Sequence, residues 1–387
     1  MKTIIKYIQD ICNIWWKELK YILLDEGMLL FVSILPLAYP ILYSWIYNNE
    51  VVREVPVVVV DNSHSSMSRK FVRMYDASPN VHVKYYAQNL DEAKNIIGHE
   101  DAYGVLYFPE DFATKINRME QSHVGVYCDM TLMLAYKNVY QTATAVSGLM
   151  GAGIQTKMLG NYTHHEDVVA AQPLAYEEVP IFNTTGGYGN FILPGVLILI
   201  LQQTLLLGMG LCSGTLREKY GRVILRDPLY KNTLQIVAGK WLAYMLQYMI
   251  LAAYILLIIP KVFGFVSIIY AKDFFMLVIP YIISCIFFAM TTMSIIRQRE
   301  DVLLIVVFTS VPLLFIAGVS WPGSAMPAFW EYLGYLFPST FGIKAFIEMN
   351  SMGARLEDVQ PYIWALWMQA LIYLGTTLLI YRRELKK

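Results

Sequence analysis

Residues 191–212 read FILPGVLILILQQTLLLGMGLC, a run of 22 residues without Asp, Glu, Lys, Arg or His. Roughly 20 apolar residues are enough to cross the hydrocarbon core of a bilayer as an α-helix, so this run predicts a transmembrane helix. Similar runs lie on both sides of it. Together they predict six spans, at residues 28–48, 191–212, 241–260, 274–296, 302–321 and 362–381.

The composition of the whole chain also indicates a membrane protein. Of its 387 residues, 56% are hydrophobic and only 16% are charged, a low charge density for a soluble protein. The first apolar run begins too far from the N-terminus for a signal peptide and lacks a small-residue cleavage site. A polytopic membrane protein is therefore expected.

The Lys and Arg residues of the short loops predict the orientation of the spans. Sixteen of them lie on one side, in the N-terminal segment, after the second and fourth spans and in the C-terminal tail. The other side has only four: Lys261, Lys272, Lys344 and Arg355. Because basic residues concentrate in cytoplasmic loops, both termini are expected in the cytoplasm.

Residues 49–187, between the first two spans, have the composition of a separate domain. They carry 10 basic and 16 acidic side chains, a balance of −6, and all six histidines of the chain. Strand-like runs such as VPVVVV (55–60) alternate with helix-like segments, which predicts an α/β domain. The predicted fold class is a polytopic α-helical membrane protein (six transmembrane helices) with an inserted α/β extracytoplasmic domain.

The remaining segments belong to the membrane part. Residues 1–27 place apolar residues at helical spacing with lysines between them, which predicts an amphipathic helix at the cytoplasmic surface. Within the transmembrane domain of residues 188–387, residues 213–240 form the predicted cytoplasmic coupling loop. Residues 321–360 are too apolar for an ordinary loop, and prolines divide them into pieces too short to span, so they predict an outer re-entrant hairpin.

Two constellations in the outer domain could suggest chemistry. Asp61, Ser63 and His64 follow a predicted strand, where such residues more often close a turn and cap a helix than catalyse a reaction. His164-His165 lacks further ligands at a recognisable spacing, so a solvated loop is preferred to a metal site. The chain is not expected to be an enzyme.

The predicted spans offer neither a nucleotide site nor buried charge. Gly239-Lys240 lacks the flanking residues of a phosphate loop, so no ATP site and no cofactor are expected in this chain. The absence of ionisable residues inside the spans argues against an ion-coupled carrier. The strongest polar groups there either line a pathway or, as we favour, bond between helices; they are Gln202, Gln203 and Gln247.

The order of these parts resembles the type-2 ATP-binding-cassette (ABC) export permeases, the subgroup with a large extracytoplasmic domain between the first two transmembrane helices. The resemblance covers nearly the whole chain. VPVVVVDNSHSSMSRK (55–70) is similar to the subgroup's apolar strand followed by Asp, Ser and Ser-Arg. LPGVLILILQQTLLLG (193–208) is similar to its second span.

Two further segments carry the resemblance to functional positions. LREKYGRVILRDP (216–228) is similar to the ATPase-coupling segment, with Arg222 where the family usually has Thr. The resemblance implies coupling roles for Arg217, Glu218, Lys219, Gly221 and Pro228. GVSWPGSAMPAFW (318–330) and FPSTFGIKAF (337–346) are similar to the outer hairpin through Gly318, Pro322, Met326, Pro327, Pro338 and Thr340.

The resemblance implies the permease subunit of an ABC exporter in a bacterial cell (inner) membrane. Such a subunit forms a homodimer or a related heterodimer and binds two copies of a separate ABC ATPase, which holds ATP and Mg. Drug- or lipid-like cargo, hence multidrug efflux, and a periplasmic adaptor on the outer domain are further expectations; a nucleic-acid partner is not. The alternatives are a membrane-anchored receptor or surface protein without an ATPase, and an outer-domain hydrolase.

Overall fold

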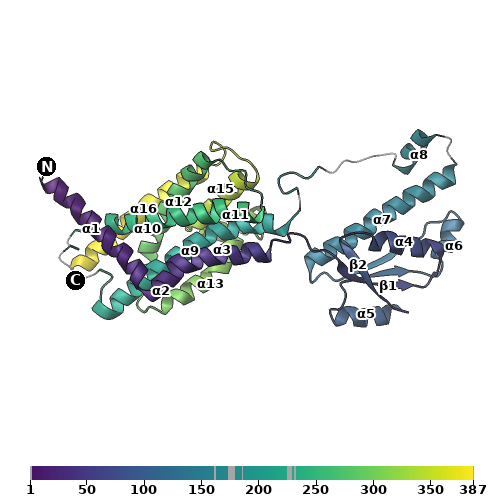
Figure 1. Ribbon diagram of the computed structural model, residues 1–387, viewed down its shortest axis with the longest axis horizontal. Helices are drawn as coiled ribbons and strands as arrows, with labels where there is room; N and C mark the ends of the chain where they lie inside the picture. Colours follow the sequence, from purple (N-terminus) through teal and green to yellow (C-terminus); the bar gives the residue numbers. More distant parts are fainter. Residues whose placement is uncertain are drawn as a thin grey trace. The chain divides into compact units, whose positions relative to one another are not determined.

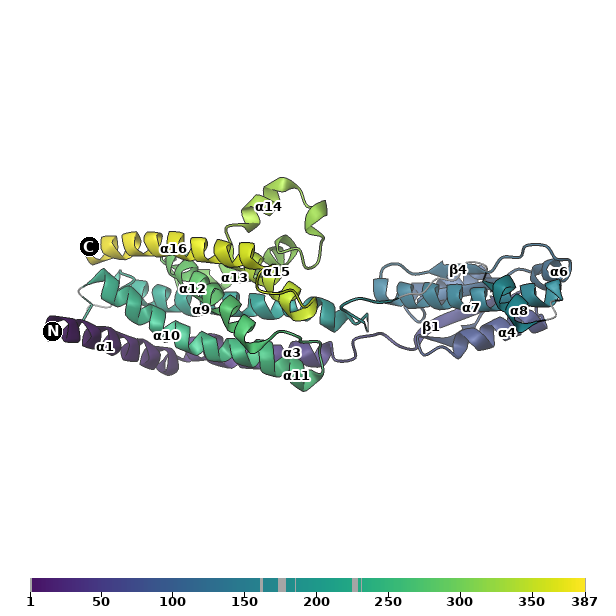
Figure 2. The same ribbon diagram turned by 90° about the horizontal axis from the view of Figure 1, so that it is seen from above.

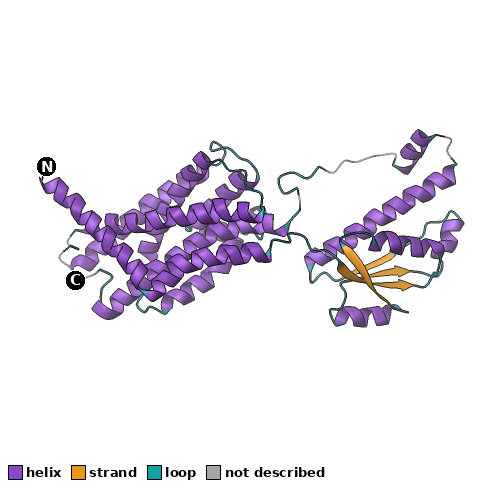
Figure 3. Cartoon of the chain, in the orientation of Figure 1, coloured by secondary structure: helices purple, strands orange, loops and turns teal. Residues whose placement is uncertain are grey.

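The computed structural model of the chain describes residues 2–160, 163–172, 179–184, 186–224, 229–230 and 232–386. These residues form two compact units (Figure 1). The helical unit comprises Met1–Glu50 and Pro180–Lys387, and the sheet unit comprises Val51–Val179. All the described strands lie in the sheet unit (Figure 3).

Five stretches of the described residues are helical, long and apolar enough to cross a membrane. All five stretches come after the N-terminal helix α1 (Lys2–Leu24) in the chain. They are Glu26–Ile46 with α2 (Glu26–Met28), the π-helix η1 (Leu29–Ile34) and α3 (Leu35–Ile46); α9 (Tyr188–Tyr220); Thr233–Phe263 with α10 (Thr233–Ala253), the π-helix η2 (Tyr254–Ile258) and α11 (Ile259–Phe263); α12 (Ala271–Met293); and α16 (Gln360–Lys386).

The remaining predicted span, residues 302–321, is a shorter helix than expected. α13 (Asp301–Ile316) has 16 residues, about 24 Å of helix, against a hydrocarbon core of about 30 Å. It ends just before Gly318, whose φ of +86° lies in the left-handed region that favours glycine. The six-span count therefore stays a prediction.

The predicted coupling loop, residues 213–240, is largely helical, and its boundaries were wrong. Residues 213–220 belong to α9 and residues 233–240 to α10, so only residues 221–232 connect the two helices. The prediction ended each span where the apolar run ended. Both helices continue past that point because Glu, Lys, Arg and Gln are good helix formers.

α9 lies at the centre of the helical unit (Figures 1 and 2). It is buried along most of its length and packs against α12, α13 and the hairpin helix α15 (Pro338–Ser351). Its Gly208 makes room for the buried side chain of Val32 in η1: a Cβ at Gly208 would lie 2.1 Å from Cγ2 of Val32. Any movement of α9 must therefore involve its neighbours.

The predicted hairpin consists of the 3₁₀ turn η3 (Gly323–Ala325), α14 (Ala328–Gly334) and α15. Its tip contacts the middle of two long helices. Gln202, the fifteenth of the 33 residues of α9, accepts a hydrogen bond from Ser339 N at 2.7 Å. Gln369 of α16 donates to Tyr335 O at 2.7 Å. The hairpin thus turns about halfway along the helices.

The two segments that lead out of the helical unit toward the sheet unit lie side by side. Tyr188 N donates to Glu50 O at 2.9 Å, and the rings of Tyr47 and Tyr188 are 5.5 Å apart. The side chain of Asn190 donates to the Glu50 carboxylate and accepts from Val266 N at 2.8 Å. These contacts join the end of α3 to the start of α9.

The sheet unit has four strands in the order β2-β1-β3-β4. Its central strand β1 is parallel to β2 and β3, and β4 is antiparallel to β3. In chain order the elements are β1 (Val55–Asp61), α4 (Ser66–Asp76), β2 (Val81–Tyr86), α5 (Leu90–Gly98), β3 (Gly104–Phe108), α6 (Phe112–Asn117), β4 (Gly125–Cys128), α7 (Met133–Leu159) and α8 (His164–Ala171).

The run of valines in β1 explains why helices cover both faces of this sheet. Val57 and Val59 pack with Phe71 of α4 and Val139 of α7, whereas the alternate valines of β1 form a second cluster that includes Ala93 of α5. A strand buried on both faces reads as a continuous apolar run. Strands and helices alternate along the chain from β1 to β4.

Asp61 forms a structural turn. Its Oδ1 accepts hydrogen bonds from Ser63 N and His64 N, each at 3.1 Å, and its Oδ2 accepts from Ser68 Oγ at 2.7 Å. The N-cap of α4 is Ser65, which forms a capping box with Ser68. The turn interpretation is confirmed, although the cap itself lies four residues later.

The prediction of a solvated loop at His164-His165 is wrong. These residues are the first two of α8, because Thr163 and Glu166 form a capping box that starts a helix there.

Candidate functional site

The last turn of α9 carries the residues that the resemblance assigns to coupling. α9 ends at Tyr220, and Gly221 N donates to Arg217 O at 2.8 Å. The φ of Gly221 is +68°, which a residue with a Cβ adopts only with strain. The side chains of Glu218, Lys219 and Tyr220 are exposed, whereas Arg217 is half-buried. Residues 218–221 form an exposed tip, which we call the α9 tip.

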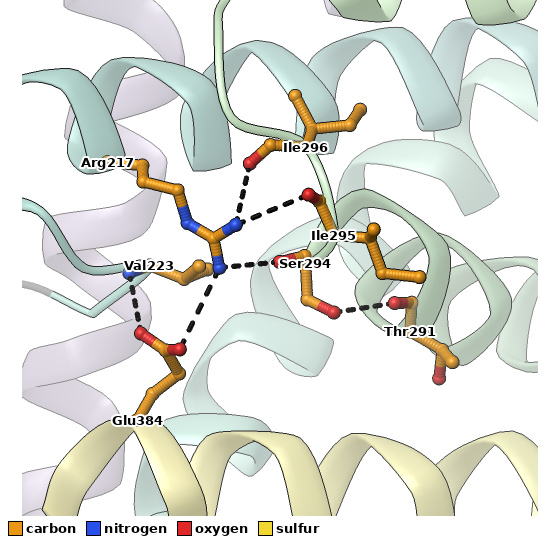
Figure 4. A network of polar contacts seen from close by, with 7 residues as sticks. All are labelled: Arg217, Val223, Thr291, Ser294, Ile295, Ile296 and Glu384. Atoms are coloured by element: carbon orange, nitrogen blue, oxygen red, sulfur yellow. Dashed lines mark hydrogen bonds and ion pairs between the residues drawn. The ribbon is translucent and has the colours of Figure 1, made fainter. Parts of the chain in front are cut away.

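Arg217 binds the carbonyl end of α12 (Figure 4). Its Nη2 donates to Ser294 O at 2.7 Å, and its Nη1 donates to Ile296 O at 3.0 Å and Ile295 O at 3.3 Å. Ser294 is the C-cap of α12, Ile295 and Ile296 follow it, and a cation at the C-terminal end of a helix is stabilised by the helix dipole. Arg217 therefore fixes the end of α9 to the end of α12.

The same guanidinium reaches the C-terminal helix. Nη2 of Arg217 lies 3.7 Å from Oε1 of Glu384 in α16, and the Glu384 side chain is almost completely buried. Glu384 Oε2 also accepts from Val223 N at 3.5 Å, just beyond the α9 tip (Figure 4). A buried carboxylate requires such partners because burial removes its hydration.

Arg299 joins the α9 tip to the first membrane helix. Its backbone N–H donates to Oε1 of Glu218 at 2.6 Å, and its Nη2 lies 2.8 Å from Oδ1 of Asp25. Asp25 is also the N-cap of α2. The close approach requires Gly214, where a Cβ would lie 2.8 Å from Arg299 Cα. One residue between α12 and α13 thus connects α9 with α2.

A third ion pair joins α1 to α10. Lys240 Nζ lies 2.9 Å from Glu18 Oε1, and both side chains are at least 93% buried. Tyr230 donates its hydroxyl to the same oxygen at 3.2 Å, and burial raises the pKa of Tyr230, so this hydroxyl stays protonated. Gly239 lets the helices approach, since a Cβ there would lie 2.5 Å from Ile14 Cγ2.

Lys240 also corrects the expectation that the spans lack interior charge. The predicted third span began at residue 241, but α10 begins at Thr233, so Lys240 is two turns inside the helix. Glu18 lies between Ile14 and Ile22 on the buried face of α1. An acidic residue on an apolar helix face was the signal that could have identified it.

Of the predicted coupling residues, Arg217 contacts Glu384, and Glu218 contacts Arg299, which in turn pairs with Asp25. Lys219 and Gly221 lie on the exposed α9 tip. Pro228 lies outside the described residues. The partners of Arg217 and Glu218 could not be predicted because they come from distant parts of the sequence.

The three glutamines have different surroundings. Gln202 binds Ser339 N of the hairpin. Gln247 of α10 donates to Val32 O at 3.2 Å and Ser33 Oγ at 2.9 Å, both in the π-helix η1. Gln203 is buried, and neither of its amide atoms has a hydrogen-bond partner within the described chain. The packing interpretation fits Gln202 and Gln247, and Gln203 stays a pathway candidate.

The predicted hairpin residues mark its turns and helix starts. Gly318 turns the chain after α13. Pro322 and Met326 flank η3, Pro327 precedes α14, and Pro338 is the first residue of α15, positions where a missing N–H costs little. Thr340 follows in the first turn of α15, and its side chain is buried.

Among the described residues, no group of three or more His, Cys, Asp or Glu side chains could hold a metal ion. The candidate site is the set of polar contacts beneath the α9 tip.

Comparison with known families agrees with this architecture. A family model described as ABC-2 family transporter protein matches residues 27–379. Comparison with curated proteins finds no match. Because the match spans most of the sequence, the chain belongs to the ABC-2 transporter family, is a multi-pass membrane protein and is the permease component of an ABC transporter, a component that associates with an ABC ATPase subunit.

Proposed function

We propose that this permease is an exporter subunit and that the ATPase pushes on the α9 tip. Two copies of the permease would form the pathway, and two copies of the ATPase would bind ATP and Mg on the cytoplasmic side. The α9 tip would then face the cytoplasm, as would both termini, in a bacterial inner membrane. The distribution of Lys and Arg supports this orientation.

The observation that carries the proposal is the attachment of one exposed helix end to several other helices. Glu218 accepts the backbone N–H of Arg299, and Arg217 binds the end of α12 and Glu384 of α16. A displacement of the α9 tip would therefore move these elements together. Charge-assisted hydrogen bonds are stronger than neutral ones, which suits a joint that bears load.

The hairpin would receive this movement through α9. Gln202 lies about 22 Å along the helix axis from Arg217 (15 residues at about 1.5 Å each) and binds the first turn of α15. A tilt of α9 that starts at the α9 tip would displace the hairpin at the level of Gln202. ATP would have to favour the displaced state by several kcal/mol to reverse its population.

The composition of the chain bears on the cargo and on the role of the sheet unit. The apolar interior favours drug- or lipid-like molecules, and the acidic balance of residues 49–187 favours docking of a basic surface of an adaptor. The adaptor would sit outside the cytoplasm, consistent with the position of the sheet unit between the first two membrane helices.

The test uses the permease and its ATPase co-expressed and reconstituted together. Glu218→Ala removes the acceptor of Arg299 N, and we expect it to abolish the stimulation of ATP hydrolysis by the permease while the complex still assembles. Arg382→Gln, at an exposed position of α16 without a proposed coupling role, is the control and should change stimulation little. If the control variant lost more stimulation than Glu218→Ala, the contact with the ATPase would lie elsewhere in the chain.

Gly221→Ala extends the test to the backbone of the α9 tip. At a φ of +68° the alanine costs roughly 1 kcal/mol, and Gly221→Asn, which tolerates this conformation better, should retain more stimulation. If no ATPase co-purified with the wild-type chain, the receptor without an ATPase would be the better description.

A further inference from the structure

An apolar groove opens beside the hairpin. It measures about 290 Å³ and is lined by Pro312, Phe315 and Ile316 of α13 and by Trp321, Met326 and Trp330 of the hairpin segment. Its size is close to the lower limit of ordinary ligand pockets. Trp321, Trp330 and Phe315 are exposed, so the groove opens to the surroundings of the helical unit.

The groove continues along α13 as an apolar stripe. Val307, Phe308 and Val311 are each more than 60% exposed, and they precede Phe315 by one and two turns of α13. Figure 2 shows α14, which carries Trp330, at the edge of the helical unit, where its last residue Gly334 packs against Ile316 of α13. In a membrane protein, such a surface meets acyl chains.

One cation, Lys344, lies near Trp321 of this groove. Cε of Lys344 in α15 is 3.9 Å from the position of a Cβ at Gly318, which stands between the groove residues Ile316 and Trp321. Lys344 is half-buried and has no ion pair or hydrogen bond within the described residues. An unpaired, half-buried ammonium in a membrane protein is costly unless an anion accompanies it.

The carboxylates of the same helices are engaged elsewhere. Glu348, one turn after Lys344, accepts from the hydroxyl of Tyr362 at 3.1 Å, and Glu331 accepts from Tyr335 at 2.7 Å. Lys344 lies about 9 Å along α15 from Asn350, whose carbonyl accepts Ile268 N in the loop at that end of the helices. A lysine side chain can extend over much of this distance toward the headgroup region.

We propose that the groove binds an anionic phospholipid of the bilayer, with one acyl chain against Trp321 and Trp330 and the phosphate on Lys344. The groove supplies the apolar contact, and Lys344 supplies the preference for a negatively charged headgroup. The site requires only that the chain lies in a membrane. It does not depend on ATPase coupling or on export.

The experiment measures quenching of tryptophan fluorescence by brominated lipids, with the full chain in phosphatidylcholine vesicles. The signal of the groove is the difference between wild type and the Trp321→Phe/Trp330→Phe double variant. Brominated phosphatidylglycerol should half-quench this signal at about a fivefold lower mole fraction than brominated phosphatidylcholine, the ratio expected for one basic side chain. Lys344→Gln should make the two lipids equal, while Lys344→Arg should keep the preference.

Lys272→Gln is the matched control, because Lys272 is exposed at the start of α12 and does not border the groove. It should leave the fivefold ratio unchanged. Equal quenching by the two lipids in the wild type would overturn the proposal. So would a preference that survives Lys344→Gln, or an absence of quenching in both lipids, which would indicate that a second copy of the chain covers the groove.

Discussion

Lys240 Nζ lies 2.9 Å from Oε1 of Glu18, and this pair joins the N-terminal helix α1 to the interior of the membrane helix α10. The removal of one member of a buried ion pair leaves an uncompensated charge, whereas the replacement of both by apolar residues is often neutral. Variants of this pair therefore test whether it attaches α1 to α10.

Glu18→Leu alone should lower the free energy of unfolding by about 3–5 kcal/mol. Addition of Lys240→Met should restore most of this loss, and thermal unfolding in detergent measures both. Lys20→Gln on an exposed position of α1 is the control and should stay within about 0.5 kcal/mol of wild type. Additive losses in the double variant would contradict a direct pair.

Arg217→Lys should not preserve the joint between α9 and α12. Arginine presents a planar fork that here meets three carbonyls and Glu384, and an ammonium cannot reproduce this arrangement. We expect a loss of roughly 1.5–3 kcal/mol in unfolding free energy, with reduced stimulation of the ATPase. Arg222→Lys, beyond the helix end, is the comparison; an equal loss there would remove the special role of Arg217.

Gly208→Ala should destabilise the packing of α9 on η1, because its Cβ would lie 2.1 Å from Val32 Cγ2. Overpacking of this kind costs about 1–3 kcal/mol. Val32→Ala in the same chain should recover part of the loss, which identifies the clash. Gly375→Ala is the matched control, since no atom lies within 4 Å of its Cβ position, and it should be neutral or stabilising.

Gln202→Leu and Gln203→Leu should distinguish a glutamine that bonds between helices from one that lines the transport pathway. Gln202→Leu leaves Ser339 N without its acceptor in a buried place, at a cost of about 1–3 kcal/mol. Gln203→Leu removes an amide that has no described partner, so stability should be unchanged or increased. If Gln203→Leu preserves stability but alters the ATPase stimulation caused by candidate drugs or lipids, Gln203 lies on the pathway.

The local parts of the fold could be predicted from the sequence because their causes are local. The start of α5 is an example: Asn is a common N-cap residue, and Asn89 Oδ1 accepts Glu92 N at 2.8 Å at the first turn of this helix. The run VPVVVV (55–60) likewise predicts the strand that the structure has as β1. Apolar runs predict membrane helices but not their ends.

The candidate site could be predicted only in part. Arg217 and Glu218 were identified through the resemblance, but Asp25, Arg299 and Glu384 carry no local pattern that indicates a partner. The residues of the Arg299–Asp25 pair are 274 positions apart in the chain. Such contacts are set by how the helices pack, and a single sequence does not specify this packing.

The hydrogen bond from Tyr188 N to Glu50 O has an evolutionary and practical consequence. The helical unit brings Glu50 and Tyr188 together at this point. The sheet unit is therefore an insertion that is connected to the helical unit by two adjacent chain segments. Insertions succeed where chain ends meet at a surface. Evolution could therefore replace or delete this inserted domain without changing how the helices pack. The inserted domain could then diversify while the helical unit stays constant.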